Sequence, residues 1–180
     1  LHNAAMLGAL APIEHYAVPT WVRVLHVNLT AAMALTQVLL PLLRAAPDPA
    51  IVFTTSGVTR RAAPYQGAYA ASKHAVEGLA TTLAAELADG PPPMRVNTID
   101  PGATRTRLRR QAYPGQNTDL LPAVESQVDA YLALLGPRGR HLRGPTLRNF
   151  PPGRSEGGGR ADDRAQVTEV GDRGAGDHEV

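Results

Sequence analysis

The sequence predicts an α/β protein built on a parallel sheet. Two long stretches with helical spacing of apolar residues, 20–44 and 68–88, alternate with two short runs rich in β-branched residues, 50–55 and 94–99. The run 50–55 is suited to a buried parallel strand. Strand and helix in alternation indicate a parallel sheet with right-handed crossovers.

The N-terminal third predicts a strand end followed by a long helix. Residues 1–5 are typical of a strand that runs into a loop, and Thr20 is suited to cap a helix that ends near Arg44. Apolar residues recur along this helix every three or four positions, and Asn28 interrupts them. The predicted buried stripe consists of Trp21, Val24, Leu25, Asn28, Ala32, Leu35, Leu39 and Leu42.

The remaining elements follow from breaks in the sequence. A loop at 56–67 separates the strand at 50–55 from the helix at 68–88, which three prolines end. The strand at 94–99 stops at Asp100-Pro101-Gly102, and a third helix at 123–135 and a last strand at 146–150 follow. Residues 1–150 are therefore expected to form one domain. Residues 151–180, with no aromatic residue and much glycine and arginine, are expected to be a disordered tail.

Composition limits the classes of function. The net charge of +2 gives no reason to expect a nucleic-acid partner. The chain has no cysteine, which removes thiolate metal sites and fits a reducing compartment, so we expect no metal and a cytoplasmic location. Residues 24–43 carry no charge, but polar residues interrupt them, so a core helix is favoured over a membrane span.

Lys73 is the only lysine in the chain, and it follows Tyr69 by four residues. A single lysine among arginines suggests a position that needs a compact ammonium group. Residues four apart share one face of a helix, so the phenol and the ammonium are expected side by side. The cation is then expected to lower the pKa of Tyr69.

With these residues, the chain resembles the short-chain dehydrogenase/reductase family. Tyr69-Ala-Ala-Ser-Lys73 resembles the central motif of the family, and Ser56 stands where the family keeps its serine. The other landmarks, in the family's order, are His2-Asn3-Ala4-Ala5, Asn28, Arg95-Val96-Asn97, Pro101-Gly102 and Thr106. The segment from Tyr131 through Gly144 to Gly153-Arg154 is similar to YciK-type bacterial oxidoreductases.

The resemblance implies an oxidoreductase that uses NAD or NADP to reduce a carbonyl or oxidise a secondary alcohol. Tyr69 would be the general acid or base, Ser56 would bind the substrate oxygen, and Lys73 would bind the ribose hydroxyls of the cofactor. Asn28 would anchor a water in a proton relay. The cofactor cleft would be shaped by Asn3, Ala4, Pro101, Gly102 and Thr106, together with Tyr69 and Lys73.

The glycine-rich phosphate loop of the family is not found in the sequence, and neither are the first strand-helix units. We therefore expect an N-terminally truncated chain, the C-terminal part of a Rossmann-like doubly wound sheet. One alternative is a non-catalytic fragment that acts as a dimerisation or interaction module. A nucleotide-sugar epimerase or dehydratase is a less favoured alternative.

Two further expectations concern partners. The resemblance implies a small-molecule substrate and a homo-oligomer that forms through the two long helices at 20–44 and 68–88. The basic cluster of Arg105, Arg107, Arg109 and Arg110 lies in a segment that tends to be a mobile lid in the family. It could bind an acidic substrate or cofactor phosphates, but a solvated loop is favoured.

Overall fold

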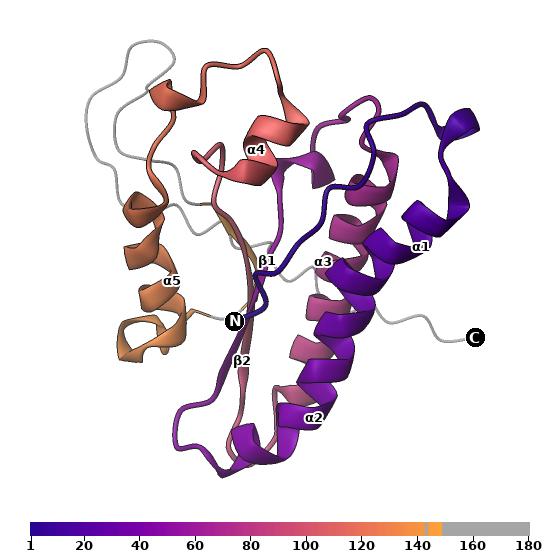
Figure 1. Ribbon diagram of the computed structural model, residues 1–180. Coiled ribbons are helices and arrows are strands. Elements are labelled where there is room, and N and C mark those ends of the chain that lie inside the picture. The colour runs from indigo at the N-terminus through magenta and orange to yellow at the C-terminus, as the bar shows by residue number, and fades with distance from the viewer. Residues whose placement is uncertain (143, 149–180) are drawn as a thin grey trace, which may run out of the picture.

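A computed structural model describes residues 1–142 and 144–148, which form a three-layered α/β unit (Figure 1). Its sheet contains β1 (Ala50–Thr54), β2 (Arg95–Asp100) and β3 (Gly144–Arg148), all parallel and in the order β1-β2-β3. Ile51 of β1 pairs with Val96 of β2. The register between β2 and β3 shifts between Asn97 and Ile99. The predicted parallel α/β class is confirmed.

The N-terminal residues extend the sheet beyond β1. His2 pairs with Phe53 in parallel: its N–H donates to the carbonyl of Val52 at 2.8 Å, and its carbonyl accepts from the N–H of Thr54 at 2.9 Å. The imidazole ring stacks on Phe53 with 4.7 Å between ring centres. The expected strand end at residues 1–5 therefore lies along the outer edge of β1.

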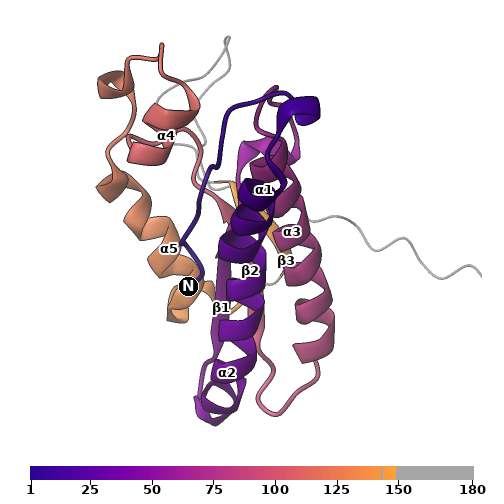
Figure 2. The ribbon, with the colours of Figure 1, turned by 45° about the vertical axis from the view of Figure 1, so that its right-hand side comes forward.

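Helices cover both faces of the sheet. On one face, α1 (Val18–Leu25) and α2 (Ala31–Ala45) run beside α3 (Gly67–Leu87), and on the other lies α5 (Val128–Leu135) (Figures 1 and 2). The short α4 (Arg107–Ala112) lies near the carboxyl ends of the strands. Single 3-10 turns occur at Ile13–His15, Gly57–Thr59, Thr118–Leu120, Val124–Gln127 and Pro137–Gly139.

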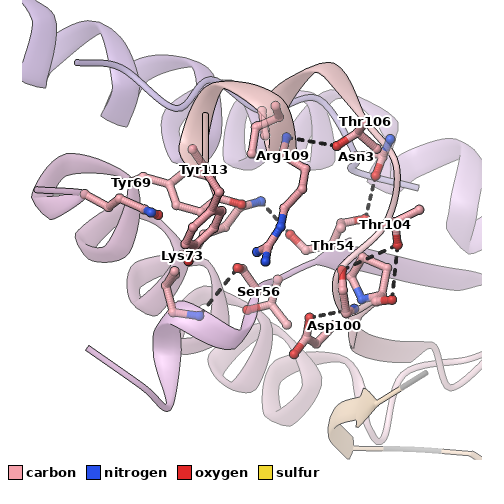
Figure 3. A pocket seen from close by; sticks show the side chains of 18 of the residues that line it. Asn3, Thr54, Ser56, Tyr69, Lys73, Asp100, Thr104, Thr106, Arg109 and Tyr113 are labelled. Atoms are coloured by element: carbon pink, nitrogen blue, oxygen red, sulfur yellow. Dashed lines mark hydrogen bonds between the residues drawn. The ribbon is translucent and has the colours of Figure 1, made fainter. Parts of the chain in front are cut away.

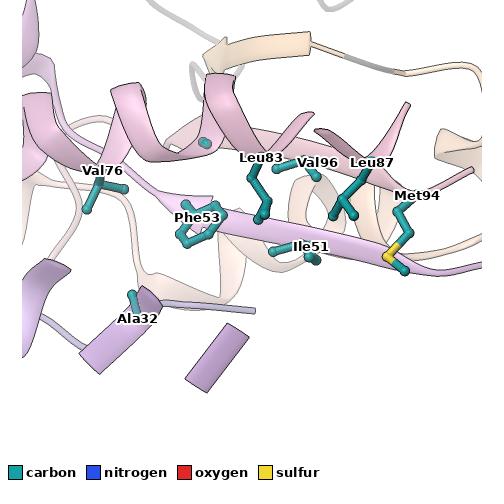
Figure 4. Packing of buried hydrophobic residues seen from close by; sticks show 9 residues of the cluster. Ala32, Ile51, Phe53, Val76, Leu83, Leu87, Met94 and Val96 are labelled. Atoms are coloured by element: carbon teal, nitrogen blue, oxygen red, sulfur yellow. The ribbon is translucent and has the colours of Figure 1, made fainter. Parts of the chain in front are cut away.

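The larger hydrophobic core lies between the sheet and α3. Ile51 and Phe53 of β1 point to this side, where Leu83 and Leu87 of α3 pack over them (Figure 4). Val52 alternates to the opposite face and packs with Ile99 and Leu134 under α5. Because successive residues of β1 are buried on opposite faces of the sheet, its sequence is a continuous apolar run.

The predicted buried stripe of the first long helix is correct at its start and wrong further on. Val24, Asn28 and Ala32 are buried, but Leu35 and Leu42 are 50% and 70% exposed. The reason is a π-helical turn, His26–Thr30, between α1 and α2. It adds one residue to the turn and so rotates the following face. The core-facing residues of α2 are Ala32, Thr36, Leu40 and Leu43.

The C-terminal elements agree in part with the sequence. The helix expected at 123–135 begins with a 3-10 turn and becomes α-helical at Val128. The strand expected at 146–150 is β3, which begins at Gly144; residues 149 and 150 lie outside the described residues. So does the tail at 151–180, whose expected disorder stays a prediction.

Among the described residues, the stretch Val18–Ala45 is long and apolar enough to cross a membrane. Length and composition are the only grounds for that assignment, and core helices of soluble proteins also satisfy them. Leu29, Leu40 and Leu43 of this stretch pack against the core between the sheet and α3. The expected cytoplasmic location stays a prediction.

Candidate active site

A cavity of about 400 Å³ opens at the carboxyl ends of β1 and β2, beneath α4 (Figure 3). Parallel α/β sheets bind their ligands at this edge, because the loops that leave the strands diverge there. Its lining includes Ser56, from the loop after β1, and Tyr69 and Lys73, from α3. The structure thus brings together three of the four residues predicted as catalytic.

Ser56 lies immediately after β1, where the chain turns into the 3-10 turn Gly57–Thr59. Its side chain lines the cavity together with that of Tyr69, and its hydroxyl accepts from the N–H of Val58 at 3.5 Å. The Thr59 hydroxyl donates to the carbonyl of Ser56 at 2.9 Å and also to Glu77 of α3 at 2.9 Å. These bonds fix the loop that carries Ser56 against the helix that carries Tyr69.

Tyr69 and Lys73 lie one turn apart near the start of α3, and both face inward. Tyr69 is 7% exposed and Lys73 is 3% exposed. The Lys73 ammonium lies 5.8 Å from the centre of the Tyr69 ring and donates to the carbonyl of Thr54 at 2.6 Å. Burial lowers the pKa of Lys73 to about 8. The helical spacing therefore produces the expected neighbours.

The expected direction of the Tyr69 pKa is wrong for this structure. Burial raises the pKa of Tyr69 above its ordinary value, and the neighbouring Ser56 hydroxyl only partly offsets that rise. Removing a phenolate from water disfavours the charged form, and the Lys73 ammonium is directed to a backbone carbonyl. Tyr69 is consequently a protonated phenol at neutral pH.

Asn28 is buried, but it does not line the cavity. Its Nδ2 donates to the carbonyl of Met6 at 2.9 Å and to the hydroxyl of Ser72 at 2.8 Å, while its Oδ1 accepts from the N–H of Met6 at 2.7 Å. Ser72 directly precedes Lys73 on α3. Asn28 therefore connects the N-terminal segment to the helix of the candidate site, and these bonds explain a polar residue on an apolar stripe.

Most residues predicted to bind the cofactor line the cavity. Asn3, Pro101, Gly102 and Thr106 do so, whereas Ala4 is exposed and its neighbour Ala5 takes the place at the wall. Gly102 adopts a positive φ of 72°, which favours glycine, and its N–H donates to Asp100 at 3.0 Å.

Asp100 is a cavity residue to which the sequence analysis gave no role. It is 9% exposed and forms an ion pair with Arg60, which also lies 3.9 Å from Glu77. Its position as the last residue of β2, at the carboxyl edge of the sheet, was the available signal. Arg60 and Glu77 lie on a loop and a helix with no pattern that would pair them.

The segment around Arg95 does not reach the cavity. Arg95 is at the opposite end of β2, where its guanidinium donates to the carbonyl of Leu134 at 2.8 Å and pairs with Asp48 at 3.1 Å. Asn97 donates to the carbonyl of Leu142 at 3.3 Å. Only the end of this segment, from Asp100 to Gly102, reaches the site.

The basic cluster is not a solvated loop as a whole. Residues 107–112 form α4, with Thr106 as its cap: the Thr106 hydroxyl accepts from the N–H of Arg109 at 3.1 Å. Arg107 and Arg109 line the cavity; Arg109 is half-buried, whereas Arg105, Arg107 and Arg110 are exposed. The favoured expectation of a solvated loop is therefore wrong for Arg109, which the capped helix turns to the cavity.

The parallel sheet and the polar cavity at the carboxyl ends of its strands define an α/β protein of the Rossmann-like class. The sequence profile of the short chain dehydrogenase family matches residues 1–117. The chain belongs to this family, which confirms the resemblance found in the sequence.

Relatives and solved structures agree with this membership. The chain is 40% identical over 157 residues to YciK, an uncharacterized oxidoreductase of Escherichia coli K12, covering 87% of this chain and 61% of YciK. The structure of YciK from E. coli matches with a TM-score of 0.76 at 39% identity, over 82% of this chain and 59% of that one.

Two further structures are similar. A short-chain dehydrogenase from Pseudomonas syringae matches with a TM-score of 0.77 at 43% identity, over 82% of this chain and 59% of that one. One from E. coli CFT073, in complex with NADPH, matches with a TM-score of 0.77 at 39% identity, over 82% of this chain and 60% of that one. The chain thus spans about three fifths of the length of these relatives.

Proposed function

We propose that the protein is an NAD(P)-dependent oxidoreductase that reduces a carbonyl compound or oxidises a secondary alcohol. The observation that carries the proposal is that Ser56 and Tyr69 line one cavity together with the buried Lys73. Two hydroxyls that face one point can both bind a single substrate oxygen, and one of them can transfer a proton to it.

The residues of the cavity fit a nicotinamide cofactor. The buried ammonium of Lys73 can donate three hydrogen bonds, and the carbonyl of Thr54 takes one of them, so further donors remain for ribose hydroxyls. Asn3, Gly102 and Thr106 would border the same ligand. The bound nicotinamide would supply or accept the hydride. Because the similar E. coli CFT073 protein was solved with NADPH, NADPH is the first cofactor to test.

In the reductive direction, Tyr69 would donate its proton to the carbonyl oxygen of the substrate. Its raised pKa keeps that proton in place at neutral pH, so the acid is ready before reaction. Ser56 would donate a hydrogen bond to the same oxygen and stabilise the negative charge that develops there. In alcohol oxidation the roles reverse, and Tyr69 must first lose its proton.

Asn28 would support the site in the proposed mechanism. Both N–H groups of its amide are bonded, to Met6 and Ser72, so a relay water would have to donate to its single amide oxygen, Oδ1, which also accepts from the N–H of Met6. The bond to Ser72 would also hold the turn of α3 that presents Lys73. The water relay remains part of the proposal.

The direct test is turnover by the complete gene product with NADPH and with NADH. We expect loss of the reduced cofactor's absorbance on addition of a suitable aldehyde or ketone, and its appearance with a secondary alcohol at higher pH. Binding of NADP(H) without turnover of any carbonyl across a broad panel would contradict the proposal.

We further propose that two copies pair through α2 and α3. Apolar side chains are exposed on α2, with Val38 at 71% and Leu42 at 70%, and the outer face of α3 beside it carries small residues such as Gly78 and Ala85. Small side chains allow close helix approach. A protein that self-associates but binds no cofactor would instead favour the second candidate function, a non-catalytic interaction module.

A further inference from the structure

Arg109 lies where the candidate active site meets a second, larger cavity. This second cavity, of about 980 Å³, is bounded by the loop that follows Ser56 and by residues around Gly102 and α4. Ser56, Asp100, Arg109 and Tyr113 line both cavities. Figure 3 shows Arg109 reaching from α4 into the first cavity. A substrate bound at Ser56 would therefore extend past Arg109.

The guanidinium group of Arg109 is held in a defined orientation. Its Nε donates to Oε1 of Gln116 at 2.7 Å, and its central carbon lies 3.8 Å from the centre of the Tyr113 ring. The two terminal nitrogens make no hydrogen bond or ion pair with any residue that the structure describes. An oriented, partly buried cation with its terminal donors unused is prepared to bind an anion.

The charges around the two cavities favour an anionic ligand. Asp100 is the only carboxylate among the described lining residues, and Arg60 and the N–H of Gly102 already occupy it. Arg107 and Lys73 border the first cavity, and Arg61 borders the second. Positive side chains in a cleft raise the local concentration of anions and act most strongly where water is partly excluded.

We propose that the substrate carries a carboxylate group in addition to its carbonyl or alcohol, and that Arg109 binds this carboxylate through its terminal nitrogens. This inference rests on the proposed oxidoreductase function. The planar guanidinium group matches the two oxygens of a carboxylate in a bidentate pair. With the carbonyl oxygen at Ser56 and Tyr69, the carboxylate would lie at the junction of the cavities and set the orientation of the substrate.

The position of Arg109 favours a substrate over the phosphates of the cofactor. Of the residues proposed to bind the cofactor, only Gly102 borders the second cavity, whereas Arg109 borders both. Arg107, two residues earlier on α4, borders the first cavity alone. Arg107 is therefore the arginine of α4 better placed for the cofactor.

The test compares an acid with its own ester. We would measure kcat/KM for NADPH-dependent reduction of 4-carboxybenzaldehyde and of methyl 4-formylbenzoate by the complete gene product. In the wild type we expect a higher kcat/KM for the acid than for the ester. In Arg109→Gln the ratio of the two kcat/KM values should fall by about ten- to a hundredfold, the effect expected when a charged hydrogen-bonded pair is lost. Arg109→Lys should keep part of the preference. Arg110→Gln, an exposed arginine on the same helix, should keep all of it.

Several outcomes would overturn the inference and leave the oxidoreductase proposal intact. These are an equal or better rate with the ester in the wild type, an unchanged ratio in Arg109→Gln, or an equal rise in the KM for NADPH with both aldehydes. If neither aldehyde is reduced, calorimetric binding of 4-(hydroxymethyl)benzoate in the presence of NADP decides. The anion site is supported if Arg110→Gln still binds this compound and Arg109→Gln does not. It is overturned if the wild type does not bind the compound.

Discussion

Tyr69 and Lys73 are both buried ionisable groups, and burial acts on them in opposite directions. It raises the pKa of the phenol and lowers the pKa of the ammonium to about 8, because in each case it disfavours the charged form. The two pKa values, which are similar in water, therefore move apart in the fold. As pH rises, the Lys73 ammonium loses its proton before the Tyr69 phenol does.

Removing the Tyr69 hydroxyl tests its role as the proton donor. We expect Tyr69→Phe to lower kcat for carbonyl reduction by about 10²- to 10⁴-fold, the usual contribution of a general acid. The dissociation constant for NADPH, measured by fluorescence titration, should change little. Tyr16→Phe, which removes a hydroxyl bonded outside the cavity to the N–H of Ala9, serves as the control. Full turnover by Tyr69→Phe would exclude the assigned role.

The lowered pKa of Lys73 predicts how cofactor binding depends on pH. Above pH 8 the side chain increasingly loses its charge and one donor proton, so NADPH affinity should weaken as pH rises through about 8. Well above pH 8, the dissociation constant for NADPH should rise by about tenfold per pH unit. The measurement is a fluorescence titration of NADPH across that range.

Lys73→Arg is the matched variant for this prediction, because a guanidinium group keeps its charge throughout. Its NADPH affinity should be weaker at neutral pH, since the planar group does not fit the place of the ammonium, and should not vary as pH crosses 8. Circular dichroism would check that the variant folds. The same pH dependence in both proteins would mean that Lys73 does not contact the cofactor.

At the scale of elements, α3 has two functions that use one face. Its first turns present Tyr69 and Lys73 to the cavity, and its later turns bury Val76, Leu83 and Leu87 against the sheet. The position of the candidate site thus depends on the packing of the same helix. Two hydrogen bonds strengthen the connection, since Glu77 accepts from Thr55 and Thr59 at the end of β1.

Leu83→Ala should lower the free energy of unfolding by about 2–5 kcal/mol, because it leaves a cavity in the core below α3. Leu83 is 7% exposed and packs in the cluster with Ile51 and Phe53 (Figure 4). Thr82→Ala, at the exposed neighbouring position, should change the free energy by less than about 0.5 kcal/mol. Urea denaturation followed by circular dichroism measures both. Equal effects would mean that α3 is packed by a different face.

For the whole molecule, α2 exposes several large apolar side chains to solvent. The π-helical turn at His26–Thr30 directs Leu35, Val38 and Leu42 outward while Thr36 turns in. Thr36 is tolerated in the core because its hydroxyl donates to the carbonyl of Ala32 and bonds with His2, both at 2.8 Å. A partner helix would bury the exposed face.

Val38→Arg should therefore dissociate the protein into single copies, because a buried unpaired charge in the interface is costly. Size-exclusion chromatography with light scattering measures the mass. Leu120→Arg is the matched control: Leu120 is 73% exposed, close to the 71% of Val38, but lies far along the chain in the turn Thr118–Leu120. A monomeric wild type, or an unchanged mass in Val38→Arg, would contradict pairing through α2.

The sequence by itself determined the α/β class, the bounds of α3 to within one residue and the pairing of Tyr69 with Lys73. These features depend on local periodicity: alternation of strand and helix, and the four-residue spacing that puts two side chains on one helix face. The position of Ser56 just after a buried strand was likewise readable, since the carboxyl ends of parallel strands meet at one edge.

Only the tertiary structure decided the rest. The π-helical turn that rotates the buried face of α2, the pKa direction of Tyr69, the distance of Arg95 from the cavity and the inward position of Arg109 all depend on contacts between distant segments. Burial and hydrogen-bond partners come from residues tens of positions away, and a local pattern does not contain them. The four-residue spacing places the phenol of Tyr69 beside the ammonium of Lys73, but burial by the surrounding fold determines the direction in which each pKa shifts.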